Sequence, residues 1–116
     1  MTPLLTTEDL TRRFASRLGV EGLSLSLEHG DIVGLAGLNG AGKSTTLAMM
    51  AGVLRPSRGQ VLVGGRSIVR DRRARRFVGF APDRAPLYPE LTVREYLDFS
   101  ARLHGLSGDD VKQAVL

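Results

Sequence analysis

One glycine-rich segment combines residue types that can hold the phosphates of a nucleotide. Residues 37–44 read Gly-Leu-Asn-Gly-Ala-Gly-Lys-Ser and match G-x-x-x-x-G-K-[ST] at every fixed position. Glycines let successive backbone N–H groups turn inward and form a concave anion site. Lys43 adds a point charge for the β- and γ-phosphates, and Ser44 offers a hydroxyl to Mg²⁺. The expected phosphate-binding residues are Gly37, Leu38, Asn39, Gly40, Ala41, Gly42, Lys43, Ser44 and Thr45.

The elements on either side of this loop suit the same chemistry. The short apolar run at residues 32–36 predicts a strand buried on both faces. Residues 44–54 contain good helix formers and predict a helix that ends before Pro56. The order strand, glycine loop, helix brings the positive end of the helix dipole to a bound phosphate.

Further strands and a loop are predicted around this centre. Apolar and polar residues alternate over residues 23–27, the period of a half-buried strand, and residues 29–31 predict a turn. Two more strands are expected at residues 60–63 and 77–81. Residues 82–89 contain three prolines and predict a loop.

The last quarter of the sequence predicts two helices. Thr92 and Glu95 form a capping-box pattern, and the helix that they begin ends at Gly105. Its mostly apolar face consists of Tyr96, Leu97, Phe99, Ser100 and Leu103. Ser107 and Asp110 begin a further helix that the sequence does not complete. Because an amphipathic helix needs a partner for its apolar face, we expect a partial, truncated domain.

Composition narrows the class of protein. The apolar fraction, 42%, is that of a folded globular chain. There is no cysteine, which excludes disulfides and thiolate metal sites. No apolar run approaches the ~20 residues that cross a bilayer, and the N-terminus lacks the pattern of a secretory signal. We expect a cytoplasmic protein that reaches a membrane only through a partner.

The net charge of +4 reflects a cluster of arginines. Its members are Arg66, Arg70, Arg72, Arg73, Arg75 and Arg76. Such a cluster can meet nucleic acid or an anionic membrane, but most charge runs are solvated surface. No aromatic residue interleaves with these arginines before Phe77, which argues against stacking on single strands. We expect the solvated surface.

The phosphate loop resembles the Walker A motif of ATP-binding-cassette (ABC) ATPases, in which Asn-Gly-Ala-Gly, here residues 39–42, is typical. The resemblance covers nearly the whole chain. Residues 22–35 resemble the strand pair before Walker A, and residues 52–61 the link after it. Residues 78–83 look like the strand that enters the Q-loop, and residues 87–97 like the start of the helical subdomain. The last stretch is most similar to subunits of drug-export, antibiotic-resistance and gliding-motility transporters.

The resemblance implies an α/β fold, the phosphate-loop NTPase core of an ABC ATPase with an N-terminal antiparallel β part. Residues 1–116 would be the N-terminal part of one nucleotide-binding domain. Residues 1–83 would hold the β-subdomain and the Walker A core. Residues 84–116 would hold the Q-loop and the start of the helical subdomain.

The resemblance also implies roles for three residues outside the loop. Phe14 would stack on adenine, where tyrosine is common in the family, and Val20 would pack nearby. Asp83 stands at the Q-loop position, where the family usually has Gln, and would reach Mg²⁺ or the attacking water, directly or through a water. The alternative for Asp83 is a loop residue beside Pro82 and Arg84.

Leu106-Ser107-Gly108 begins like the family's signature motif but comes too early, so we interpret it as a helix cap.

The implied function is that of the energy-coupling subunit of an ABC transporter, which binds ATP and Mg²⁺ and hydrolyses ATP in the complete domain. Its partners would be a membrane-spanning subunit and a second ATPase subunit, with no nucleic acid. Lys43 and Asp83 would be the catalytic residues. This chain lacks the family's downstream carboxylates and is not expected to turn over alone. Two alternatives stay open: a non-transport ABC ATPase that acts on nucleic acid, and a small phosphate-loop kinase with Asp83 as the Mg²⁺ ligand.

Overall fold

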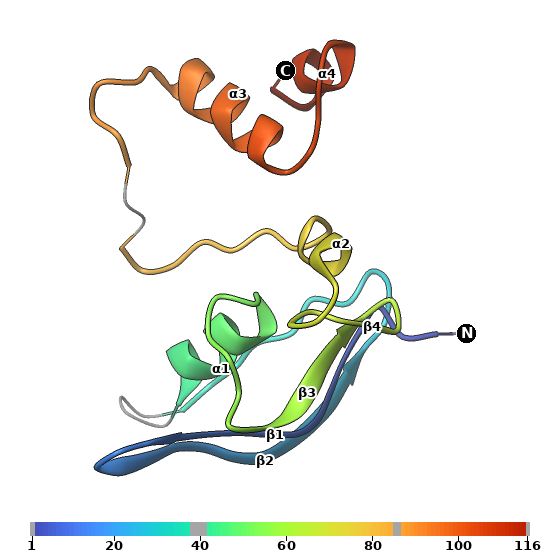
Figure 1. Ribbon diagram of the computed structural model, residues 1–116, viewed down its shortest axis with the longest axis vertical. Coiled ribbons are helices and arrows are strands. Elements are labelled where there is room, and N and C mark those ends of the chain that lie inside the picture. The colour runs from blue at the N-terminus through green and yellow to red at the C-terminus, as the bar shows by residue number, and fades with distance from the viewer. Residues whose placement is uncertain (1, 38–41, 85–86, 116) are drawn as a thin grey trace. The chain divides into compact units, whose positions relative to one another are not determined.

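The computed structural model describes residues 2–37, 42–84 and 87–115. The chain divides into two compact units, Met1–Phe80 and Ala81–Leu116 (Figure 1). The first unit contains a sheet, the helix that follows the phosphate-loop motif and one short helix. The second contains two helices.

A four-stranded antiparallel sheet forms the base of the first unit. Its strands are β1 (Leu5–Phe14), β2 (Arg17–Leu27), β3 (Arg58–Val63) and β4 (Arg66–Ser67), in the order β2-β1-β3-β4. The hairpin β1–β2 pairs from Leu5 opposite Leu27 to Phe14 opposite Arg17. Along residues 23–27 half-buried and exposed positions alternate, which confirms the strand predicted there, and β3 confirms the strand predicted at residues 60–63.

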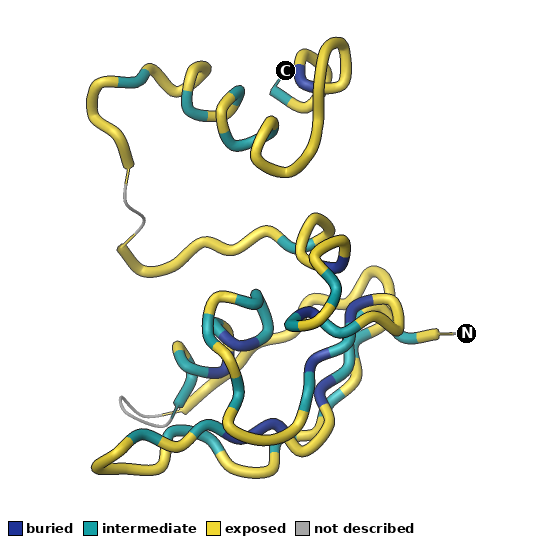
Figure 2. Tube along the Cα trace, viewed as in Figure 1, coloured by how far each residue is buried: buried dark blue, intermediate teal, exposed yellow. Residues whose placement is uncertain are grey.

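Helix α1 (Lys43–Met50) covers one face of this sheet (Figure 1). Its Met49 is fully buried against the strands, together with Leu10, Val61, Val63, Ile68 and Ala74. Ala74 belongs to the short helix α2 (Arg72–Arg75). Figure 2 shows buried positions, in dark blue, both on α1 and on the strands of the sheet. Burial of this apolar surface packs α1 against the sheet.

The helix predicted for residues 44–54 ends earlier, at Met50. Gly52 adopts φ +79°, the left-handed conformation that stops a helix. A Cβ there would lie 3.0 Å from Ile68 and 3.1 Å from Arg75. Close packing under the turn therefore requires glycine at this position.

The strands predicted at residues 32–36 and 77–81 do not form. Residues 31–37 are exposed throughout, with Ile32 99% accessible, and Phe77 is 80% accessible. A strand buried on both faces needs hydrogen-bonded neighbours and cover on each side. In the described part of the chain neither segment is hydrogen-bonded to the sheet, whose strands are β2-β1-β3-β4.

The second unit contains α3 (Val93–Leu103) and α4 (Asp109–Val115), which confirm the two predicted helices. The capping box is complete: Glu95 N donates to Thr92 Oγ1 at 3.1 Å, and Thr92 N donates to Glu95 Oε1 at 3.0 Å. The backbone donor Thr92 N holds the pKa of Glu95 below its usual value. Nothing in α3 is buried, whereas Val111 of α4 is. None of the helices that the structure describes is long and apolar enough to cross a membrane.

Candidate functional site

The start of α1 is built on a glycine that no other residue can replace without strain. Gly42 is the N-cap of α1, with φ 95° and ψ 12°. A Cβ at Gly42 would lie 2.3 Å from the carbonyl oxygen of Gly19 and 2.9 Å from Cγ2 of Val20. The last glycine of the phosphate-loop motif thus lets the N-terminus of α1 contact strand β2 directly.

Lys43, the first residue of α1, turns back along the loop. Its Nζ donates to the carbonyl oxygen of Gly37, so that the two ends of the motif meet. The ammonium group is therefore held at the loop by a neutral acceptor. A phosphate at this point would give it an anionic acceptor, with a stronger, charge-assisted hydrogen bond.

Two hydroxyl residues follow in the first turn of α1. Ser44 is exposed and Thr45 is half-buried. The first N–H groups of a helix lack intrahelical acceptors, and anions bind there for that reason. The described residues contain no group of three His, Asp or Glu side chains that could hold a metal ion. A single serine hydroxyl still fits Mg²⁺, because that ion keeps several waters and takes phosphate oxygens as ligands.

Four members of the predicted loop, Leu38, Asn39, Gly40 and Ala41, lie outside the described residues. Their contribution to phosphate binding stays a prediction.

A cavity of about 390 Å³ lies between β2 and the N-terminus of α1. Its lining includes Gly19, Val20, Leu35, Gly42, Lys43 and Thr46. The volume falls within the ~300–1,000 Å³ of small-molecule sites. The structure thus brings Val20 and Lys43, two residues predicted for one site, to the same cavity.

A larger cavity, about 580 Å³, lies away from the phosphate loop. Glu8 and Asp9 contribute two carboxylates to its wall, beside Arg55 and Arg70. Carboxylates repel phosphate, and none of the loop residues that the structure describes lines this cavity. The smaller cavity is the better candidate, because it contains Lys43.

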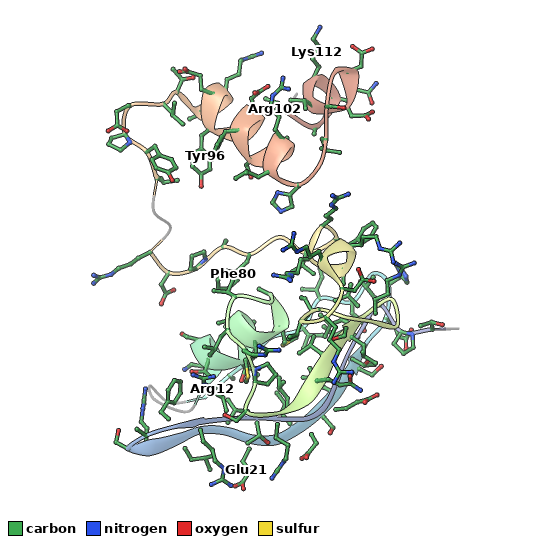
Figure 3. All side chains as sticks on the ribbon, viewed as in Figure 1. Arg12, Glu21, Phe80, Tyr96, Arg102 and Lys112 are labelled. Atoms are coloured by element: carbon green, nitrogen blue, oxygen red, sulfur yellow. The ribbon has the colours of Figure 1, made fainter. Side chains whose placement is uncertain are left out.

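Phe14 lies at the end of the hairpin and is half-buried. The guanidinium carbons of Arg12 and Arg17 lie 5.2 and 5.4 Å from its ring centroid, within the range of cation–π interactions. Arg12 is anchored by Nη1, which donates to the carbonyl of Arg55 at 2.7 Å. Figure 3 shows Arg12 on the side of the hairpin that faces α1 and Glu21 on the opposite side. The ring of Phe14 thus packs between the guanidinium groups of Arg12 and Arg17, and it does not line the 390 Å³ cavity.

Asp83 is exposed and lies in a bend of the second unit. Its interaction with a metal ion or with the residues of the loop stays a prediction. Sequence reasoning missed Gly19, Arg12 and Arg17. A glycine inside a strand marks a bulge or a close backbone approach, but the strand predicted here began only at residue 23, whereas β2 begins at Arg17.

Comparison with known proteins gives one consistent family. A family model described as "ABC transporter" matches residues 20–115. The SkfA peptide export ATP-binding protein SkfE of Bacillus subtilis is 38% identical over 112 residues, which cover 97% of this chain and 46% of that protein. The linearmycin resistance ATP-binding protein LnrL of the same species is 36% identical over 95% of this chain and 36% of its own length. The chain thus spans about half or less of these relatives.

Solved structures agree with the sequences. An ATP-binding subunit of an ABC transporter superposes with a TM-score of 0.80 at 34% identity, over 91% of this chain and 45% of that one. An ATP-binding protein of Pyrococcus furiosus, described as a putative ABC transporter, gives a TM-score of 0.74 at 26% identity, over 90% and 50%. The predicted fold class, an α/β phosphate-loop core with an N-terminal antiparallel sheet, is confirmed.

Proposed function

The chain belongs to the ABC transporter family, and we propose that it is the nucleotide-binding part of an ATPase subunit that powers transport across a membrane. The observation that carries the proposal is the Lys43 ammonium, held at the loop that precedes α1 and lining the cavity beside β2. Bound ATP would supply the phosphoanhydride bond whose hydrolysis drives the cycle.

Different groups of the chain would bind the phosphates and the base of ATP. The N-terminus of α1 and Lys43 would hold the phosphates through backbone N–H groups, the helix dipole and one full charge. Phe14 would stack on the purine, and Val20 would pack beside it. Stacking needs only the π face of a ring, so phenylalanine suffices where tyrosine is common.

Ser44 would contribute its hydroxyl to Mg²⁺ between the β- and γ-phosphates. Asp83 would act at the γ-phosphate end, through a water because its side chain is short. In this role Asp83 would influence hydrolysis and communication with a partner more than nucleotide affinity.

Two protein partners complete the proposal. A membrane-spanning subunit would hold this subunit at the cytoplasmic face of the membrane, and a second ATPase subunit would close over the nucleotide. The names of the relatives, peptide export and linearmycin resistance, favour an export or resistance system. The nucleic-acid alternative has less support, because the relatives named above are ATP-binding proteins of export and resistance systems. The kinase alternative has less support, because the matching family model, over residues 20–115, is described as ABC transporter.

A binding titration with Mg-ATP tests the phosphate site. Lys43→Ala removes the charge and should weaken binding at least about 10-fold, since a hydrogen bond to a charged group contributes roughly 1.5–3 kcal/mol. Lys112→Ala, which removes an exposed lysine from α4, is the matched control and should bind as the unaltered protein does. Equal affinity of the two variants would refute the assignment of Lys43.

A further inference from the structure

Gly19 occupies an irregular point of strand β2. Arg12 and Arg13 are consecutive on β1, but their partners on β2, Val20 and Leu18, are two residues apart. Gly19 is therefore the extra residue of a β-bulge. Bulges re-aim side chains and are frequent beside functional sites, so the position calls for a specific explanation.

On one side, Gly19 is covered by the ring of Phe14. A Cβ at Gly19 would lie 2.7 Å from Cε2 and 3.2 Å from Cδ2 of that ring, and 3.2 Å from the carbonyl oxygen of Arg12. Real Cβ atoms essentially never approach another heavy atom as closely as 2.7 Å. The backbone carbonyl cannot yield easily, so any side chain at this position would push the aromatic ring away.

Gly19 also contacts the phosphate loop. Its carbonyl oxygen is the atom that leaves no room for a side chain on Gly42, the N-cap of α1. Gly19 lines the 390 Å³ cavity together with Lys43, whereas Phe14 does not line it. One peptide thus touches both the aromatic ring and the start of the phosphate-binding helix.

We propose that Gly19 is a positioning residue that sets how far the Phe14 ring stands from the phosphate loop. The proposal rests on the proposed function and adds a determinant of base recognition to it. Without a side chain, Gly19 lets the ring lie against the strand that carries Gly42. The base and the phosphates of one nucleotide then find their partners at a fixed separation. A methyl group at Gly19 points at the ring, its nearest neighbour, so it should disturb the base more than the phosphates.

The test compares ATP with inorganic tripolyphosphate, which has the phosphates without the base, on the full-length protein with Mg²⁺. Gly19→Ala should weaken ATP binding about 5-fold or more, the scale of one base–aromatic stack. Binding of tripolyphosphate should change less than about 2-fold, because its contacts lie at α1. Gly34→Ala is the matched control, since a Cβ at Gly34 meets nothing within 4 Å, and it should leave both affinities unchanged.

The double variant Phe14→Ala/Gly19→Ala separates positioning from general damage. With the ring absent, the added methyl has lost its closest contact and keeps only the carbonyl oxygen of Arg12, at 3.2 Å, so the double variant should bind ATP much as Phe14→Ala does. This comparison still tests the proposal if Gly19→Ala alone folds poorly. Additive losses, or an equal loss of tripolyphosphate binding by Gly19→Ala, would overturn the proposal. If Lys43→Ala weakens neither ligand, the proposed function itself fails; if only the Gly19 predictions fail, the phosphate site stands.

Discussion

The two units of this chain are stabilised by different kinds of interaction. The first unit buries Leu10, Met49 and Ile68 completely between α1 and the sheet. In the second unit nothing in α3 is buried, and Leu103 is 70% exposed. The capping box of Thr92 and Glu95 fixes the start of α3, and Tyr88 packs edge-on against its Phe99. Tertiary packing thus holds the proposed nucleotide site, whereas local hydrogen bonds define the start of α3.

This difference suits the tasks proposed for the two units. Phosphate binding needs backbone N–H groups and an ammonium group at fixed positions, which a packed core provides. A segment with few buried contacts has a low cost of local rearrangement. The apolar face of α3 therefore suits contacts with further protein, such as the transporter subunit proposed above.

Leu10→Ala should give the largest effect and confine it to the first unit. Leu10 is fully buried, and truncating such a leucine typically costs about 2–5 kcal/mol. Thermal unfolding followed by circular dichroism would measure the loss, and nucleotide binding should fall with it. The matched change Leu97→Ala, at a position 43% exposed in α3, should cost much less. Similar losses at the two positions would show that the units are equally dependent on packing.

Phe14→Ala should weaken ATP binding by about 1–3 kcal/mol, the contribution of one aromatic stack. Phe14→Tyr keeps the π face and should bind nearly as well as the unaltered protein. Phe99→Ala removes a half-exposed ring from the second unit and serves as the control in an ATP titration. If Phe99→Ala lowered affinity more than Phe14→Ala, the base site would belong to the other unit.

Asp83→Gln should separate binding from turnover in the full-length subunit. The change gives the side chain the length usual in the family and removes its charge. ATP affinity should stay within a few-fold, because Lys43 and the N-terminus of α1 supply the phosphate contacts. Phosphate release should change, and a steady-state ATPase assay would detect it. Complete loss of ATP binding would mean that Asp83 has a structural role.

Thr92→Ala should have the smallest effect, about 1 kcal/mol on the second unit, the typical cost of losing an N-cap hydroxyl. The same cap predicts a pH dependence. The pKa of Glu95 is lowered in the folded chain, so its contribution is present above its usual value near 4.5 and is lost as the pH falls through the lower, folded value. Helical circular dichroism between pH 7 and pH 3 should show this loss. Thr92→Ala should show less of it, and an unchanged pH profile would contradict the role of the cap.

Features determined by neighbours in sequence could be predicted. The capping box joins residues three apart, and the phosphate-loop motif specifies its own glycines and lysine, so both followed from residue type and spacing. The strands predicted at residues 32–36 and 77–81 were wrong, because a buried strand also depends on partners far away in sequence. The same limit applies to Asp83. Its position in the sequence suggests a role at the Q-loop, but it does not predict which atoms the side chain contacts.

Gly19 was missed for a related reason. Its significance depends on a bulge in the pairing of β1 with β2 and on the approach of Gly42, neither of which the spacing of residues reveals. Phe14 could be proposed only through resemblance to a family. Its two arginine neighbours, Arg12 and Arg17, became visible once the hairpin register was known.

Amide hydrogen exchange with and without Mg-ATP tests the central claim most directly, that the nucleotide binds where the hairpin meets the N-terminus of α1. Bound nucleotide should slow exchange in two peptides, residues 14–20 and residues 42–46. Residues 93–103 of α3 should exchange as before, because that helix lies outside the proposed phosphate and base contacts. The protection should disappear in Lys43→Ala and persist in Lys112→Ala. Unchanged exchange at both peptides under saturating ATP, or equal protection in Lys43→Ala, would contradict the account.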